Sequence, residues 1–448
     1  MKILHYFLGF PPYRSGGLTK YAFDLMTAQS ENGDEVAALW PGQMNIINKK
    51  LRVMKRHAVQ GILNYEIINP LPVPLDEGIM DVGEFIKPYI GTAYIKFLEE
   101  SKPNIIHVHT LMGIHKEFFE AAKKLGIKLV FTTHDYFGIC SKVTLYHDGN
   151  VCVNDHGCND CIQCNFGALS LNKIGFMQSP VYRTLKNSIV IKYLRSRHRK
   201  NFFEGKSQNT FSGTPRMKVK ASDYERLREY YKKIFSYIDM FHFNSSVAEK
   251  IYKKYVSVER SCVLSLTHKD VADNRTANLW KYSGKLKITL LAPAKPFKGF
   301  HILIDALDEM WKYGNRDFVL NLYGTVTEKK PYLNIQKEGF TYEQLREIFA
   351  NTDILVAPSI WYETFGFTVL EALSYCVPVI VSDRVGAKDI VGNGGIIVPA
   401  GDVEKLKEAI ESLNENTLKK LRKAIQEEIT IKTWTQFVSE NYELYARV

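Results

Sequence analysis

The sequence predicts an α/β protein made of two doubly wound domains in tandem. Three observations support this fold class: the length of 448 residues, the alternation of short apolar runs with longer helical stretches, and the repetition of that alternation in both halves. At roughly 100 to 200 residues per domain, two cores are expected. Strands that are continuous apolar runs, separated by helices, are typical of parallel sheets covered on both faces.

Each expected element is a run rich in Val, Ile, Leu, Phe and Tyr or a longer helical stretch. The expected strands are 3–8, 35–39, 64–68, 105–109 and 129–133 in the first half, and 288–291, 318–323, 354–357, 379–382 and 396–399 in the second. The expected helices of the second half are 300–313, 342–350 and 368–375. The polar segment 267–283 has mixed charge and no period, so we expect it to link domains 1–275 and 276–430, with a binding site in the cleft between their sheets.

The composition is that of an ordinary globular protein, because 45% of the residues are hydrophobic and 24% are charged. No apolar run approaches the roughly 18 residues that a membrane-spanning helix needs. Residues 1–7 lack the long apolar stretch and the small-residue cleavage site of a secretory signal. We therefore expect a cytoplasmic protein.

The positive charge of the chain is concentrated in one segment. The whole sequence carries 59 Lys or Arg and 48 Asp or Glu, a formal net charge of +11. Residues 173–221 contain twelve Lys or Arg and one acid, Glu204, so this basic insertion has the same net charge as the whole chain. An anionic partner would therefore meet this segment and not the rest of the protein.

The strongest chemical signal is the run ETFGFTVLE, which begins at Glu363, ends at Glu371 and leads from an expected strand into an expected helix. At such a turn the amides of Gly366, Phe367 and Thr368 lie at a helix N-terminus, which favours an anion such as a diphosphate. The two glutamates can accept hydrogen bonds from hydroxyl groups. A ligand that is anionic at one point and rich in hydroxyls is a sugar nucleotide. Taken alone, the spacing also fits two ordinary helix acids.

Further motifs surround this run. Between residues 354 and 399 they are Ala-Pro-Ser, Glu-x7-Glu, Glu-Ala-Leu-Ser, Cys-Val-Pro-Val-Ile, Gly386 and Gly-Ile-Ile-Val-Pro, and outside it Lys298-Gly299, Tyr323-Gly324, Gly339-Phe340 and Gly16-Gly17. Together they resemble the donor-binding half of retaining GT-B glycosyltransferases of the family-4 group, well over residues 285–400 and in patches over the first half. The resemblance implies a GT-B fold, with two Rossmann-like domains facing across a cleft and a terminal helix, residues 431–448, that crosses back to the N-terminal domain. A simple capping helix fits that last segment equally well.

The resemblance also implies roles for single residues. Glu363 would contact the sugar of the nucleotide-sugar, Glu371 the ribose, and Lys298 the diphosphate. The arginine that the family places five residues before this lysine is Pro293 here, and Lys295 is the candidate substitute. Both lysines could instead be ordinary surface residues.

The remaining expected ligand contacts come from two glycine-containing loops. Phe340 follows Gly339 where the nucleotide base would be met, partly by backbone groups. Gly16 and Gly17 follow the first strand and precede the helical stretch 19–28, which fits a loop that faces a phosphate, although turns use the same residues. The sequence lacks a three-glycine fingerprint, which argues against a dinucleotide cofactor. We expect catalysis to require no cofactor.

Histidines occur at the ends of two expected strands. Alternation places His107 and His109 on one face, and His134 follows a strand at its carboxyl end, where cleft residues gather. In similar enzymes the histidine of the second motif lies beside the sugar, so His134 joins Glu363 and Lys298 as a catalytic candidate. His107 is more typical of a packed core histidine, and His109 fits either role.

Five of the seven cysteines fall between Cys140 and Cys164. The run Cys158-x2-Cys161-x2-Cys164, with Cys152 before it, has the short ligand spacing of a structural zinc site. Reduced thiols without metal and an iron–sulfur cluster are the alternatives.

The basic insertion mixes its charges with apolar anchors, among them Phe176, Tyr182, Ile189, Tyr193 and Phe202. Such a surface suits contact with anionic lipid, at about 1 kcal/mol per Lys or Arg near the membrane. A solvated basic helix and an RNA-binding surface are the alternatives.

These observations predict a retaining hexosyltransferase that uses a nucleotide diphosphate sugar and a glycan or lipid-linked acceptor, in cell-surface polysaccharide or glycolipid biosynthesis. It would work at the inner face of the cell membrane. A nucleic-acid-binding protein would leave Glu363 and Glu371 without a role, and a sugar-nucleotide epimerase of the same fold would need no acceptor. The sequence does not identify the sugar, the base of the nucleotide or the acceptor.

Overall fold

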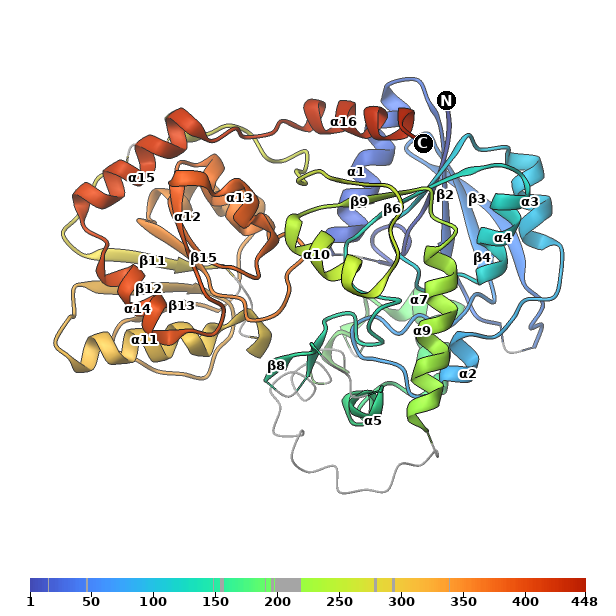
Figure 1. Cartoon of the computed structure of the whole chain (residues 1–448), viewed down its shortest axis with the longest axis horizontal. Coiled ribbons are helices and arrows are strands. Elements are labelled where there is room, and N and C mark those ends of the chain that lie inside the picture. The colour runs from blue at the N-terminus through green and yellow to red at the C-terminus, as the bar shows by residue number, and fades with distance from the viewer. Residues whose placement is uncertain are drawn as a thin grey trace.

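A computed structural model describes residues 1–14, 16–45, 47–147, 149–153, 157–189, 191–194, 197, 219–277, 280–291, 295–337 and 339–448. Two α/β bodies lie side by side, each with its own sheet (Figure 1). The predicted fold class is therefore confirmed. Within the described residues, no helix is both long enough and apolar enough to cross a membrane.

The first sheet has eight strands in the order β10-β9-β6-β5-β1-β2-β4-β3. All neighbours pair in parallel except β3, which is antiparallel to β4. The strands are β1 (Lys2–Tyr6), β2 (Glu35–Pro41), β3 (Arg52–Val59), β4 (Ile62–Ile68), β5 (Ile105–Val108), β6 (Lys128–Thr132), β9 (Met240–Phe243) and β10 (Ser261–Val263).

The second sheet has six parallel strands in the order β13-β12-β11-β14-β15-β16. They are β11 (Leu286–Leu290), β12 (Phe318–Tyr323), β13 (Leu333–Gln336), β14 (Ile354–Ala357), β15 (Val379–Ser382) and β16 (Gly395–Val398). A small hairpin, β7 (Tyr146–His147) and β8 (Asn150–Val151), lies in the cysteine-rich segment.

The helices of the first body are α1 (Gly17–Glu31), α2 (Val82–Phe85), α3 (Ala93–Ser101), α4 (Lys116–Lys124), α5 (Asn159–Cys164), α6 (Leu171–Met177), α7 (Pro180–Leu185), α9 (Ala221–Phe235) and α10 (Ser246–Tyr255). Those that follow are α11 (Phe300–Lys312), α12 (Leu345–Ala350), α13 (Phe367–Ser374), α14 (Val403–Glu411), α15 (Glu415–Glu428) and α16 (Trp434–Ala446).

Besides the small hairpin, four strands of the two large sheets were not expected from the sequence: β3, β9, β10 and β13. Three of them lie at sheet edges. An edge strand is only partly buried, so its sequence need not be a continuous apolar run, and β3 carries Arg52, Lys55 and Arg56. The fourth, β9, is fully buried, but it is four residues long and includes His242.

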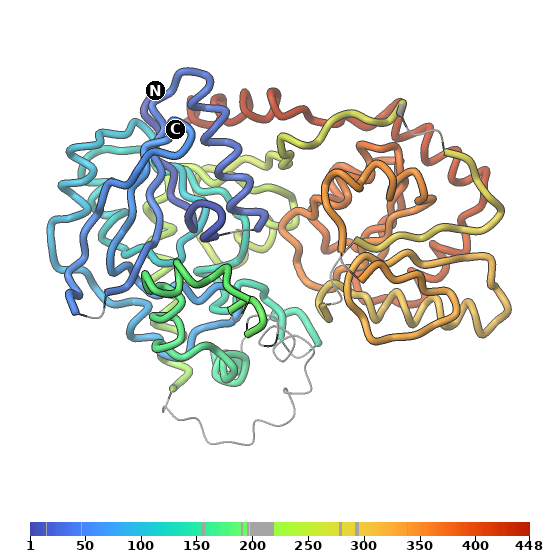
Figure 2. The backbone as a smooth tube through the Cα atoms, turned by 180° about the vertical axis from the view of Figure 1, so that it is seen from behind, coloured from blue at the N-terminus to red at the C-terminus, as the bar shows by residue number. Residues whose placement is uncertain are grey.

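Helix α16 leaves the second body and ends on the first, and both views show it running there beside the N-terminus (Figures 1 and 2). A capping box starts it, because Thr433 and Gln436 exchange side-chain-to-backbone hydrogen bonds. Leu444 and Tyr445 then pack against Ile3 and Met240 of the first sheet. The helix thus ties the two bodies together.

The two bodies also share an apolar core. Phe7, Tyr21 and Leu25 of the first body belong to the same buried cluster as Phe365 and Val369 of the second. Burial of this surface fixes how the carboxyl ends of β1 and β6 face the loop after β14.

Candidate active site

Glu363 is held by two side chains of its own domain. Its Oε1 accepts a hydrogen bond from Lys298 Nζ at 2.5 Å, and its Oε2 accepts one from Ser359 Oγ at 2.7 Å. The backbone of Glu363 is fixed as well, since its N–H donates to Arg384 and its carbonyl accepts from Gly386. The structure therefore brings together the two residues predicted to contact the sugar and the diphosphate.

Glycines shape both loops that carry this pair. Gly299 follows Lys298 with φ +75°, and a Cβ built there would lie 1.9 Å from the carbonyl oxygen of Pro358. Gly366 has φ +109° and caps helix α13, so the amides that follow it open the helix. A side chain at either position would be strained or would clash, which explains why the chain uses glycine here.

The loop of Glu363 contacts the first body directly. Thr364 Oγ1 donates to the carbonyl oxygen of His134 at 3.0 Å, and Ser245 Oγ donates to the carbonyl oxygen of Thr364 at 2.6 Å. A Cβ at Gly17 would lie 3.9 Å from the ring of Phe367, so the glycine loop after β1 also meets the start of α13. Predicted ligand residues from both bodies thus lie where the two bodies contact each other.

Glu371 is buried and paired with a histidine that sequence reasoning missed. Its Oε1 lies 3.2 Å from His268 Nε2, and the His268 ring packs edge-on against Phe367 and Tyr342. His268 lies in the expected linker, where no motif or periodicity marks it. Ser359 was also missed as a contact of Glu363, although the Ala-Pro-Ser motif contains it.

The other predicted ligand residues are Gly16, Lys295 and Phe340. Gly16 has φ +117°, and nothing lies within 4 Å of a Cβ built there. Lys295 reaches the first body, with its Nζ 3.9 Å from Asp76 Oδ2. Phe340 is half-buried and packs edge-on against Tyr323. The position of the missing family arginine, Pro293, lies outside the described residues.

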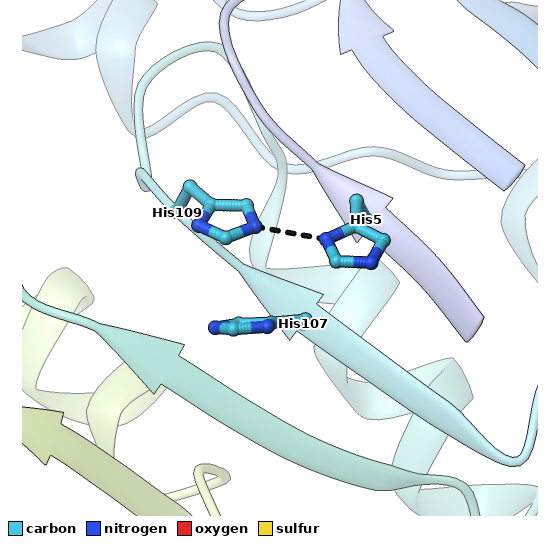
Figure 3. A group of neighbouring side chains, drawn as sticks. All are labelled: His5, His107 and His109. Atoms are coloured by element: carbon cyan, nitrogen blue, oxygen red, sulfur yellow. Dashed lines mark hydrogen bonds between the residues drawn. The ribbon is translucent and has the colours of Figure 1, made fainter. Parts of the chain in front are cut away.

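Five histidines gather beneath the carboxyl ends of β1, β5, β6 and β9. His5, His107 and His109 have ring nitrogens within 4.8 Å of one another, and they are the one group of potential metal ligands this close in the described part of the chain (Figure 3). Burial lowers the pKa of His5 and His242 to about 4 and that of His134 to about 3, and it holds the pKa values of His107 and His109 well below their usual range. All five rings are therefore neutral at pH 7.

Asp135 follows His134 in the same loop. Burial raises the pKa of its carboxyl to about 6, while a hydrogen bond from the backbone N–H of Phe137 acts in the opposite direction. Its backbone carbonyl oxygen accepts a hydrogen bond from the phenol hydroxyl of Tyr252 at 2.6 Å. The loop is thus anchored to helix α10.

The cysteine-rich segment gathers its thiols near α5 and α9. The pKa values of Cys152, Cys158, Cys161 and Cys164 are all raised, first by burial and then by neighbouring thiols, and Arg228 donates to Cys161 Sγ at 3.5 Å. Among the residues placed in this segment, no three of the sulfurs approach within 4.8 Å of one another. The zinc site therefore stays a prediction.

Part of the basic insertion packs on the first body. Arg183 of α7 pairs with the fully buried carboxylate of Glu66 at 2.7 Å, and Arg56 of β3 pairs with the same carboxylate. From the last residue of α7 onward, the side chains of Leu185, Ile189 and Tyr193 are exposed. Several predicted anchors and charges of the insertion, including Phe202, lie outside the described residues.

Comparison with known proteins identifies both bodies. Residues 273–430 match the family described as glycosyl transferases group 1, and residues 15–150 match glycosyltransferase family 4. A phosphatidyl-myo-inositol mannosyltransferase of Mycobacterium leprae is 28% identical over 180 residues, which are 37% of this chain and 47% of the relative. The chain thus spans about half the length of this curated relative.

Two solved structures show the same fold over the whole chain. Sucrose-phosphate synthase from Thermosynechococcus elongatus has a TM-score of 0.57 at 14% identity, covering 99% of this chain and 98% of that one. The catalytic domain of starch synthase IV from Arabidopsis thaliana, bound to ADP and acarbose, has a TM-score of 0.52 at 15% identity and covers 100% and 99%.

The fold is that of a GT-B protein, with the loop of Glu363 and the start of α13 in the second body beside the glycine loop of the first. The chain is a family-4 type GT-B glycosyltransferase. None of the families and relatives described above is a nucleic-acid-binding protein or an epimerase, so neither alternative gains support.

Proposed function

We propose that the protein transfers a sugar from a nucleotide diphosphate sugar to a glycan or lipid-linked acceptor, with retention of anomeric configuration. The observation that carries this proposal is the contact between Glu363 and Lys298, joined through Thr364 to the backbone of His134. These residues come from both bodies, which supports a shared site. The starch synthase structure with the same fold holds ADP, which agrees with a nucleotide site.

In this reaction the bond between the sugar and the diphosphate breaks, and negative charge grows on the leaving phosphate. Lys298, Lys295 and the amides that open α13 would stabilise that charge. Glu363 would hold hydroxyls of the sugar, and Glu371 would accept hydrogen bonds from the ribose. Retention is read from the anomeric proton of the product by NMR.

The first experiment is a thermal-shift panel of UDP-, GDP-, ADP- and dTDP-sugars with the wild type and Glu371→Ala. A ligand at 100 times its dissociation constant adds about 2.7 kcal/mol, which should raise the midpoint by at least roughly 2 °C. We expect one nucleotide family to stabilise the wild type but not the variant. The exposed Glu411→Ala is the matched control and should keep the shift. If no nucleotide sugar stabilises the wild type, the proposal fails.

We further propose that the acceptor carries a lipid and that the first body contacts an anionic membrane. A groove of about 1640 Å³ lies along the edge strand β3, helix α3 and helix α6. Its lining combines basic with apolar side chains, among them Lys55, Lys87, Lys96, Tyr89 and Ile90. Charge and apolar area on one surface suit an anionic amphiphile.

Vesicle sedimentation at low salt tests this surface. In a double variant, the exposed Ile90 of the groove and the exposed Ile189 of the basic insertion are each changed to Asp. The exposed Tyr313→Asp on the second body is the control. We expect anionic vesicles to pull down the wild type and the control but not the double variant. Equal sedimentation with neutral vesicles would refute the proposal.

We also propose structural zinc at Cys152, Cys158, Cys161 and Cys164. The support is the clustering of these thiols, whose thiolate forms are disfavoured by burial and by neighbouring sulfurs and would be stabilised by a bound cation. Their side chains would have to turn toward one centre. Metal analysis should find about one equivalent of zinc in the wild type and in Cys376→Ser, and none in Cys161→Ser/Cys164→Ser. Wild-type protein without zinc or iron would end the metal hypothesis.

A further inference from the structure

A single chain of hydrogen bonds runs through the first body from the cleft to the segment that follows β10. It links His134, His109, His5, Gln29, Tyr445, His107, Thr132, His242 and the carbonyl oxygen of Leu264. The members come from four strands, from α1 and from the returning helix α16. From His109 to His242 every side chain in it is buried.

The hydrogen bonds leave no ring nitrogen of the three clustered histidines for a metal. His5 bonds His109 through Nδ1 and Gln29 through Nε2, and His107 bonds Tyr445 through Nδ1 and Thr132 through Nε2. The remaining nitrogen of His109, Nδ1, lies 3.4 Å from His134 Nε2. The cluster in Figure 3 is therefore explained as a hydrogen-bonded network.

The direction of every hydrogen bond in this network can be assigned by starting from the carbonyl oxygen of Leu264. A carbonyl oxygen only accepts, so His242 donates from Nε2 to Leu264 at 2.9 Å. A neutral imidazole has one N–H, which leaves His242 Nδ1 to accept from the hydroxyl of Thr132 at 2.9 Å. Thr132 has no second proton, so it accepts from His107 Nε2 at 2.7 Å.

The same reasoning assigns the direction of the hydrogen bonds from His107 to His109. His107 Nδ1 accepts from the hydroxyl of Tyr445 at 2.7 Å, and Tyr445 accepts from the amide nitrogen of Gln29 at 3.1 Å. The amide oxygen of Gln29 then accepts from His5 Nε2 at 2.7 Å. His5 Nδ1 must accept from His109 Nε2 at 2.9 Å.

The last member is His134, whose Nε2 donates to His109 Nδ1. Its Nδ1 has no hydrogen bond to any residue that the structure describes, and its side chain is partly exposed. Its backbone carbonyl accepts from Thr364, beside Glu363. The nitrogen available to a ligand is therefore the unprotonated one.

We propose that this chain fixes His134 as the Nε2–H tautomer, so that its Nδ1 accepts a hydrogen bond from a hydroxyl of the bound sugar. The positioning residues are His109, His5, Gln29 and Tyr445. Because Tyr445 lies on α16, the direction of the hydrogen bonds depends on the docking of that helix. The ligand role rests on the proposed function, whereas the tautomer does not.

Long-range ¹H–¹⁵N spectra of protein labelled at histidine test the tautomers without substrate. We expect five rings, assigned with single His→Gln variants, to show a protonated Nε2 and an unprotonated Nδ1 at pH 7. An Nδ1–H tautomer or an imidazolium at His5, His107, His109 or His134 would overturn the proposal. Inactive protein with the expected spectrum would refute only the proposed transferase activity.

Tyr445→Phe tests whether the chain controls His134. Without this hydroxyl the side-chain amide of Gln29 can turn over, so that its oxygen and nitrogen exchange places. His5, His109 and His134 could then each carry the ring proton on the other nitrogen. We expect a second tautomer at His134 and about a fivefold lower kcat, the worth of one hydrogen bond, with the KM for the nucleotide-sugar within about twofold. Tyr332→Phe removes a buried tyrosine hydroxyl that bonds Asp308 in the second body, and should change neither quantity. An unchanged His134 spectrum in Tyr445→Phe would contradict the proposal.

Discussion

Lys298 Nζ lies 2.5 Å from Glu363 Oε1, so the residues expected to bind the diphosphate and the sugar hold each other. Both side chains are less than one-fifth exposed. A bound diphosphate would compete with the Glu363 carboxylate for the same ammonium group. A mutation of Glu363 should therefore affect diphosphate binding and sugar transfer differently.

Glu363→Gln should lower kcat without weakening the binding of the free nucleoside diphosphate. The variant removes the carboxylate that pairs with Lys298, so we expect the free nucleoside diphosphate to bind equally well or up to about tenfold more tightly, a gain of up to 1.4 kcal/mol. Loss of a charged hydrogen bond to the sugar should lower kcat by about a hundredfold. Calorimetry and initial rates measure the two effects. Glu411→Gln, on an exposed turn of α14, is the control, and weaker diphosphate binding by Glu363→Gln would contradict the competition.

Gly299→Ala should be far more damaging than Gly314→Ala. Both glycines have positive φ, +75° and +95°, so both substitutions carry a backbone strain of about 1 kcal/mol. Only at Gly299 would the new Cβ meet a backbone oxygen, that of Pro358. We expect an additional loss of about 1–3 kcal/mol for Gly299→Ala, from overpacking, measured by denaturant unfolding. Equal losses would show that the loop after η2 (Pro296–Lys298) relaxes freely.

His268→Leu should weaken binding of the nucleotide-sugar. His268 Nε2 bonds Glu371, and without it the buried carboxylate loses its partner among the side chains that the structure places there. We expect the KM to rise about fivefold, as for one lost hydrogen bond, with little change in kcat. His301→Leu, on the exposed face of α11, serves as the control. A lower kcat at constant KM would mean that His268 acts in the chemical step.

Acid should destabilise the first body. Burial lowers the pKa of His5, His115 and His242 to about 4 and of His134 to about 3, and it lowers those of His107 and His109 as well. The unfolded chain takes up these protons near pH 6.5 whereas the folded protein does not, so stability present above pH 6.5 is lost as the pH falls. Each histidine contributes about 1 kcal/mol of loss between pH 7 and 5.5. Asp135, with its pKa raised to about 6, acts in the opposite sense and offsets about one histidine.

Thermal unfolding at pH 7.0 and 5.5 measures this effect. We expect the midpoint of the first body to fall by about 10 °C. A midpoint that stays constant over this interval would show that the histidines are not held neutral.

Arg183→Met should destabilise the protein, because Glu66 is fully buried and, among the residues that the structure describes, would keep only Arg56 as an ionic partner. Removing one partner of a buried ion pair costs about 3–5 kcal/mol, although the remaining pair reduces that loss. Arg226→Met removes an exposed arginine 3.8 Å from Asp223 and should cost less than about 1 kcal/mol. Denaturant unfolding compares the two, and equal losses would argue against a structural role for Arg183.

The sequence by itself determined the fold class and the spacing of the expected ligand residues in the second body. The continuous apolar run Ile354–Ala357 forms a buried parallel strand, because both faces of such a sheet are covered. Glu363, Gly366 and Glu371 are close in sequence, so local geometry alone sets their spacing. The edge strands were missed because a partly exposed strand needs no continuous apolar run.

Only the tertiary structure decided which distant side chains meet. His5 and Tyr445 are 440 positions apart, yet Gln29 bonds both, and His268 reaches Glu371 from a segment without any motif. Such contacts depend on burying the apolar surface shared by the two bodies and on docking α16 against the first sheet. No local pattern encodes them, because hydrogen bonds between distant residues form where packing has already brought the side chains together.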